Sequence, residues 1–151
     1  MKSNNFRQQI TDTLKAIGLY SENAVELLMG TCAQESHLGK YRRQLGGGPA
    51  LGIFQMEPAT FRDISENYLR YKPELREKIL QAAGIEYFNA EELVDNDWMA
   101  ICFARVHYLR VKEAIPCNLS GWAYYWKRYY NTRLGKGTEE EFIANYKKYN
   151  I

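Results

Sequence analysis

The sequence predicts a mainly α-helical protein that folds as a single domain. Apolar residues recur every three or four positions along most of the chain, which is the spacing of one helix face. No segment alternates apolar and polar residues as a half-buried strand does. With 151 residues, of which 46% are hydrophobic and 25% charged, the chain suffices for one domain with one core. We therefore expect a single helical domain over residues 1–151.

The first two helices are predicted from their apolar stripes. The first stripe consists of Phe6, Ile10, Leu14 and Ile17. The second stripe consists of Ala24, Leu27, Leu28 and Cys32. Ser21 suits the N-cap of the second helix, and Gly39 suits its stop. Glu35 continues the second stripe, so we expect a carboxylate on the buried face at the helix end.

The middle of the chain contains a glycine-rich segment and three helices. Residues 40–55 are expected to form a loop or a small hairpin. Pro58 and Pro73 each suit the first turn of a helix, and Asp95 suits the N-cap of a longer one. The stripes of the three helices are Phe61, Ile64 and Tyr68, then Leu75, Ile79 and Leu80, then Trp98, Ile101, Cys102, Arg105 and Leu109.

Two further helices complete the chain. Residues 119–130 are predicted as one helix, and six of the nine residues from 122 to 130 are aromatic. Thr138 and Glu141 form a capping-box pattern before the last helix. The stripe of that helix consists of Phe142, Ile143, Tyr146 and Tyr149.

Glu35 is the strongest candidate for a catalytic residue. Burial disfavours the charged form of a carboxyl group and raises its pKa. A carboxyl group that stays protonated near neutral pH can act as a general acid. The alternative is a structural role, in which Glu35 turns outward to solvent or pairs with Arg42 or Arg43.

Two motifs carry a resemblance to known enzymes. Glu35 and Ser36 are followed, after a variable loop, by a segment in which Gly52, Gln55, Pro58 and Thr60 match a Gly-x-x-Gln-x-x-Pro-x-Thr pattern. The pair of motifs resembles the signature of soluble lytic transglycosylases and goose-type lysozymes. The run 44–52, Gln-Leu-Gly-Gly-Gly-Pro-Ala-Leu-Gly, is similar to small bacteriophage muramidases.

This resemblance implies a lysozyme-like domain with a cleft beside the glycine-rich loop. It also implies cleavage of the β-1,4 bond between N-acetylmuramic acid and N-acetylglucosamine, with Glu35 as general acid. The product stays open between water addition by a hydrolase and a 1,6-anhydro sugar from a lytic transglycosylase. Glu57 occupies a position that is usually apolar in transglycosylases, so it is a candidate second carboxylate of a hydrolase. The alternative for Glu57 is capping of the following helix, and Asp63 is a weaker candidate second acid.

The resemblance also suggests residues that hold the glycan. The Tyr-Asn pair at Tyr130 and Asn131 is the nearest counterpart of the family's Ala-Tyr-Asn-Ala-Gly turn. It implies that Tyr130 orients Glu35 or stabilises charge as the bond breaks. The remaining expected substrate-binding residues are Ser36, Gly52, Gln55, Tyr125 and Asn131. For Gln55 and the aromatic segment, core packing is the competing interpretation.

Composition limits the partners that we expect. No His/Cys/Asp/Glu cluster has the spacing of a metal site, so we expect no metal and no cofactor. Net charge is +2, with −3 in residues 1–100 and +5 in residues 101–151, which favours an anionic polymer or surface such as the bacterial cell wall; solvated helix faces are the alternative interpretation. We expect no nucleic-acid partner. No apolar run approaches a membrane span, and no signal peptide is evident. The three cysteines, Cys32, Cys102 and Cys117, indicate reduced thiols.

These features fit a monomeric phage lysin that stays in the host cytoplasm until its release to the cell wall, or a virion-associated enzyme. Two other functions stay open at this point. One is a wall-binding module that holds glycan without turnover. The other is membrane disruption by the basic, aromatic C-terminal part, although Glu139, Glu140 and Glu141 reduce the positive charge of its last helix.

Overall fold

The computed structural model describes residues 2–131 and 135–149, and within them it is mainly helical without any β-strand. The longer helices are α1 (Ser3–Ala16), α2 (Glu22–Ser36), α3 (Pro58–Asn67), α4 (Pro73–Ala83), α5 (Asp97–Leu109), α6 (Leu119–Trp126) and α7 (Glu139–Tyr149). Short helical turns are η1 (Leu45–Gly47), η2 (Leu69–Tyr71), η3 (Ala90–Leu93) and the π-helical η4 (Lys127–Asn131). The predicted mainly helical class is therefore confirmed.

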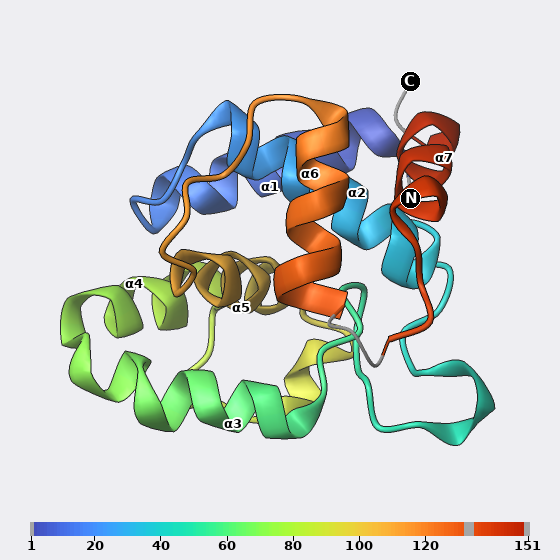
Figure 1. Cartoon of the computed structure of the whole chain (residues 1–151). Helices are drawn as coiled ribbons and strands as arrows, with labels where there is room; N and C mark the ends of the chain where they lie inside the picture. Colours follow the sequence, from blue (N-terminus) through green and yellow to red (C-terminus); the bar gives the residue numbers. More distant parts are fainter. Residues whose placement is uncertain (1, 132–134, 150–151) are drawn as a thin grey trace.

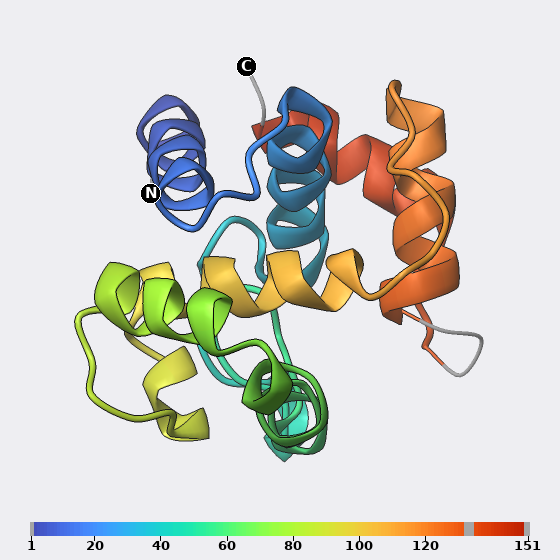
Figure 2. The same ribbon diagram turned by 90° about the vertical axis from the view of Figure 1, so that its left-hand side faces the viewer.

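The helices form one compact domain around α2 and α5. Helix α2 packs against α1, α5, α6 and α7, while α5 also contacts α3 and α4. Figures 1 and 2 show α1, α2, α6 and α7 in one half of the molecule and α3 and α4 in the other, with α5 between them. The largest fully buried side chains include Trp126, Tyr108, Phe6, Phe54, Phe103 and Phe142.

Several predicted helix starts are confirmed by capping contacts. The Ser21 hydroxyl accepts a hydrogen bond from the Ala24 N–H at the start of α2. Pro58 and Pro73 lie in the first turns of α3 and α4, where the missing N–H costs nothing. The Thr138 hydroxyl accepts from the Glu141 N–H before α7. Local side-chain chemistry therefore determines where these helices begin.

Four sequence expectations are corrected. Helix α5 is capped by Asn96, not Asp95, because the Asn96 side chain accepts the Met99 N–H. Trp98, placed on its apolar stripe, is 50% exposed. The segment 119–130 is not one α-helix, because it changes to π-helical geometry after Trp126. Helix α2 turns left-handed at His37 (φ 51°), two residues before Gly39, which also has positive φ.

The glycine-rich segment forms a loop with only fragments of a hairpin. Two isolated antiparallel bridges join Leu51 to Arg43 and to Met56, but no strand extends from them in the part of the chain described. Gly46 and Gly47 have φ near +82° and +83°, where a side chain would be strained. The loop thus crosses from the end of α2 to α3 and lies at one edge of the molecule (Figure 1).

The three cysteines are unpaired. Cys32 and Cys102 are buried in the core, and Cys117 is exposed. Burial raises the pKa of Cys32 and of Cys102 to about 12, so these thiols stay protonated. Separately, none of the helices in residues 2–131 and 135–149 is both long and apolar enough to cross a membrane.

Candidate active site

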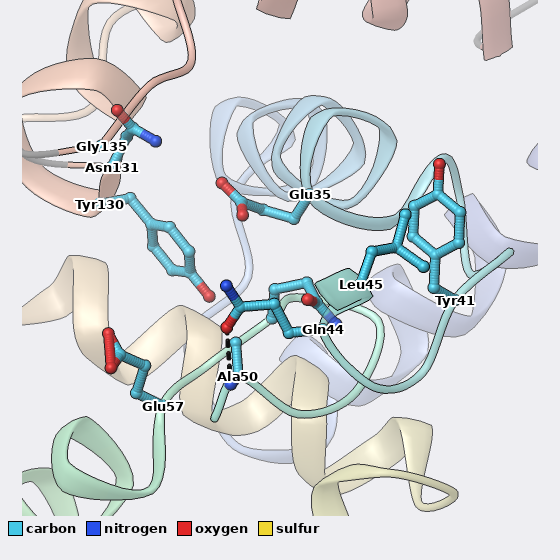
Figure 3. Close-up of a pocket in the computed structure, with 10 residues that line it drawn as sticks. Glu35, Tyr41, Gln44, Leu45, Ala50, Glu57, Tyr130, Asn131 and Gly135 are labelled. Carbon is cyan, nitrogen blue, oxygen red and sulfur yellow. Dashed lines mark hydrogen bonds between the residues drawn. The ribbon is translucent and has the colours of Figure 1, made fainter. Parts of the chain in front are cut away.

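A pocket of about 400 Å³ lies beside the end of α2. Its walls come from three parts of the chain: the end of α2, the loop that leads to α3, and the π-helical turn after α6 (Figure 3). The lining residues are Glu35, Tyr41, Gln44, Leu45, Ala50, Gln55, Glu57, Tyr130, Asn131 and Gly135. The structure therefore brings together Glu35, Gln55, Glu57, Tyr130 and Asn131 as the sequence suggested.

Glu35 is held by a hydrogen bond from a tryptophan. The indole Nε1–H of Trp126 donates to Glu35 Oε2 over 2.9 Å. Trp126 is the last residue of α6, is fully buried, and packs its ring on Phe142 with centroids 5.4 Å apart. The sequence analysis placed Trp126 in the aromatic segment but missed this contact, and nothing in the sequence pairs two residues 91 positions apart.

Burial raises the pKa of Glu35 to about 7, although the Trp126 hydrogen bond acts in the opposite direction by favouring the charged form. At neutral pH a large fraction of Glu35 is therefore protonated while its side chain borders the pocket. Glu35 forms no ion pair with Arg42 or Arg43, the two arginines considered as partners from the sequence. Arg42 instead binds Asp97 with two hydrogen bonds of 2.6 and 3.2 Å, and Arg43 pairs with Glu91.

Tyr130 faces the pocket but does not bind Glu35. Its hydroxyl donates to the Phe54 carbonyl over 2.6 Å, which ties the π-helical turn to the loop before α3. Burial raises the pKa of Tyr130 well above its usual value, so the phenol stays protonated. The expectation that Tyr130 orients Glu35 directly is therefore replaced by a role in positioning the pocket wall.

Asn131 lies beside Tyr130 at the rim of the pocket. Its Oδ1 accepts a 2.7 Å hydrogen bond from Lys127 Nζ, which also donates to the carbonyls of Gly135 and Gly137. These three bonds hold Gly135 and Gly137 close to η4. They leave the amide NH₂ of Asn131 without a hydrogen-bond partner among the described residues, and it is free to donate to a ligand.

Glu57 borders the same pocket from the residue before α3. It is exposed and occupies the N-cap position, yet its side chain makes no capping hydrogen bond. The capping interpretation is therefore not supported by a contact, and the carboxylate remains accessible to the pocket (Figure 3). Asp63 does not line the pocket, because it binds Arg110 over 2.7 Å and Asn67 over 2.8 Å.

Ser36 and Gly52 build the pocket without lining it. Ser36 is fully buried, donates to the Ile53 carbonyl over 2.7 Å and accepts from the Gly39 N–H over 2.8 Å. Gly52 has φ +79°, and a Cβ there would collide with the Leu93 carbonyl oxygen. Both residues lock the loop onto the helix end, so their expected substrate contacts are corrected to structural ones.

Gln55 combines a structural and a pocket-facing position. It has φ +49°, which is uncommon for a residue with a side chain, and its Nε2 donates to the Gly52 carbonyl over 3.0 Å. It also lines the pocket, and its side-chain oxygen accepts no hydrogen bond from the part of the chain that the structure describes, so it can accept one from a ligand. Backbone strain of this kind is concentrated at functional sites in proteins. A smaller pocket of about 70 Å³ adjoins the first one, and Gln55, Glu57 and Tyr130 line both.

Tyr125 lies outside this pocket. Its ring is buried, its hydroxyl donates to the Glu113 carbonyl over 2.6 Å, and it lines a different pocket. Trp122 likewise donates to the Pro116 carbonyl over 2.6 Å. Core packing thus explains most of the aromatic segment, and the expected glycan contact of Tyr125 is corrected. Pocket residues that were not candidates in the sequence analysis are Tyr41, Gln44, Leu45, Ala50 and Gly135.

In residues 2–131 and 135–149, no group of three His, Cys, Asp or Glu side chains is placed to hold a metal ion. No family model, curated protein or solved structure matches the chain. The candidate site therefore rests on its own geometry and chemistry.

Proposed function

We propose that this protein is a muramidase that cleaves the β-1,4 bond between N-acetylmuramic acid and N-acetylglucosamine in peptidoglycan, with Glu35 as general acid. The observation that carries the proposal is the position of Glu35. It is a largely buried carboxyl group at the wall of an open pocket, held by one indole N–H, with a pKa near 7. Such a group can deliver a proton to the oxygen of a leaving sugar.

The other pocket residues suit a carbohydrate. Amide side chains of Gln44, Gln55 and Asn131 offer donors and acceptors for hydroxyl and N-acetyl groups. Tyr41 adds an aromatic ring and Leu45 an exposed apolar side chain. A sugar ring has polar hydroxyl groups at its edge and an apolar face. It therefore requires a site in which a few polar groups surround an apolar patch.

The proposed lysozyme-like family relationship rests on the two sequence motifs and on their contact with each other at the pocket. Glu35 and Ser36 end α2, and the segment with Gly52 and Gln55 packs against that end through the Ser36–Ile53 hydrogen bond. The two motifs, 17 residues apart at this bond, form one unit at the pocket. The mainly helical domain is compatible with this relationship. The proposal of a phage lysin or a virion-associated enzyme rests on the same family relationship.

Glu57 favours hydrolysis over transglycosylation. An accessible carboxylate in the same pocket as the acid can activate water or stabilise the developing positive charge. A lytic transglycosylase needs no second carboxylate, because the muramoyl 6-hydroxyl is the nucleophile. We therefore propose that Glu57 is the second catalytic carboxylate.

Mass spectrometry of soluble products from purified peptidoglycan tests the proposal. Wild-type protein is expected to release reducing muropeptides, and Glu35→Gln none. The exposed Glu66→Gln variant of α3 is the matched control and should keep full activity. Products lighter by one water would assign a lytic transglycosylase. If wild type and Glu35→Gln both bind glycan and neither releases any product, the protein is a glycan-binding module and not an enzyme.

A further inference from the structure

A second pocket, of about 310 Å³, lies at the other end of α2. Ser21 and Asn23 at the start of α2 line it, whereas Glu35 stands at the end of this 15-residue helix. At about 1.5 Å per residue, the two ends are roughly 20 Å apart. Its other walls come from the C-terminal half of α5, from residues 111–115 and from Tyr125 of α6. The proposed function assigns no role to this pocket.

Arg105 is the unusual residue of this pocket. It projects from α5, is partly buried, and its Nε donates to the Leu19 carbonyl over 3.0 Å. Its two Nη groups have no hydrogen-bond acceptor in the described part of the chain, and no carboxylate pairs with it there. By contrast, Arg7, Arg42 and Arg110 each bind a carboxylate.

Within residues 2–131 and 135–149, no carboxylate forms an ion pair with Arg105. Burial lowers the pKa of Arg105, and only the Tyr125 hydroxyl acts in the opposite direction. Glu113 also lines the pocket, and hydrogen bonding to its own backbone and to Tyr129 lowers the pKa of its carboxylate, as do the charges of Arg128 and Lys112. A partly desolvated cation without a counter-charge costs stability, and a bound anion would remove that cost.

The other walls define what kind of anion fits. Leu109, Val111, Ala114 and Ile115 supply an apolar surface next to the guanidinium. Exposed Lys112 adds a second positive charge at the rim. The pocket volume of about 310 Å³ is roughly ten times the ~30 Å³ that one water molecule occupies in the liquid. A small inorganic ion would therefore fill only a small part of the pocket. The pocket therefore fits an organic carboxylate with a small apolar body.

We propose that this pocket binds the terminal carboxylate of a short peptide, with the free Nη groups of Arg105 as its paired donors. An arginine whose Nε is occupied still has four Nη–H groups, and the two that point outward in parallel, one from each Nη, match the two oxygens of a carboxylate. Two sources share this chemistry. The peptide stem of bacterial cell wall ends in D-alanine, and this source rests on the proposed function. A protein chain end is the L-configured source.

Isothermal titration with acetyl-D-alanyl-D-alanine, its L,L enantiomer and the C-terminal amide of each tests the site. We expect at least one acid to bind and its amide to bind at least about tenfold more weakly, because a lost charge-assisted hydrogen bond costs about 1.4 kcal/mol or more. Preference for the D,D acid identifies the wall stem as the source, and preference for the L,L acid identifies a protein chain end. Equal binding of acid and amide, or no binding, overturns the proposal.

Two variants locate the binding. Arg105→Met removes the donors and should abolish binding of the acid. Ala114→Phe narrows the pocket from an exposed position, so it tests the site even if Arg105→Met fails to fold. Retained affinity in folded Arg105→Met, or in Ala114→Phe, contradicts the assignment. These measurements involve no turnover, so their failure is distinct from failure of the Glu35 reaction.

Discussion

The indole N–H of Trp126 donates a 2.9 Å hydrogen bond to Glu35 Oε2 and thereby links the end of α6 to the end of α2. Because an indole N–H only donates, Oε2 is the acceptor in this bond, and the other oxygen, Oε1, is not engaged by it. The contact therefore orients the carboxyl group of the acid at the pocket wall. It also limits how far burial raises the pKa of Glu35.

Trp126→Phe is expected to raise the pKa of Glu35. The hydrogen bond favours the carboxylate, and a bond to a charged group is worth about 1.5–3 kcal/mol, so an upward shift of about one to two pKa units is expected. An NMR titration of the Glu35 carboxyl carbon measures it directly, without reliance on activity. In activity assays the alkaline limb of the pH profile should move to higher pH by the same amount. An unchanged or lower pKa would show that the contact does not tune the acid.

Glu35→Gln is expected to stabilise the protein above neutral pH. The pKa of Glu35 is raised from 4.5 to about 7 on folding, so the folded state binds more protons than the unfolded state between these values. Stability is therefore lost as pH rises through this window, by about 3 kcal/mol at most. Glutamine accepts the Trp126 hydrogen bond without ionising.

Thermal unfolding at pH 5 and pH 8 checks this expectation. The gap between Glu35→Gln and wild type should widen at pH 8, whereas Glu66→Gln should follow wild type at both pH values. A gap that is the same at both would mean that Glu35 ionises normally.

Glu57→Gln is expected to reduce hydrolysis by at least about a hundredfold while leaving stability within about 0.5 kcal/mol of wild type. The side chain is exposed and makes no capping bond, so its loss removes chemistry and not structure. Initial rates of reducing-end release, together with urea unfolding, separate the two effects. Full activity in Glu57→Gln would return this residue to a non-catalytic role.

Gly52→Ala is expected to destabilise the loop more than Gly47→Ala. Both glycines have positive φ, near +79° and +83°, so both substitutions introduce backbone strain of about 1 kcal/mol. Only at Gly52 does the new Cβ meet the Leu93 carbonyl, whereas Gly47 faces open space. The difference in unfolding free energy between the two variants therefore measures the cost of the contact between the new Cβ and the Leu93 carbonyl. Equal losses of stability would show that the loop moves away from Leu93 without a cost in free energy.

The sequence allowed local features to be predicted where neighbours along the chain decide them. The Ser21 cap and the prolines at the starts of α3 and α4 lie as expected, because caps depend on residues three or four positions apart. The α5 cap was misplaced by one residue, since Asp95 and Asn96 are both good caps and only packing chooses between them.

The site was predicted in part. Glu35 was found because its place on the apolar stripe of α2 is a local property that implies burial. Tyr125 was misassigned, because periodicity shows that a ring faces inward but not which wall it meets. Ser36 and Gly52 were recognised by motif, yet their contacts with Ile53 and Leu93 show that they shape the pocket from behind.

The sequence by itself determined the helical class, the helix starts and the presence of an acid on a buried face. These follow from propensity, capping and periodicity, which act within a few residues. The packing of the helices placed Trp126 against Glu35 and Glu57 in the same pocket, and it left Arg105 without a carboxylate partner among the described residues. Such pairings join residues from distant elements, and they depend on how whole helices pack, which no local pattern specifies.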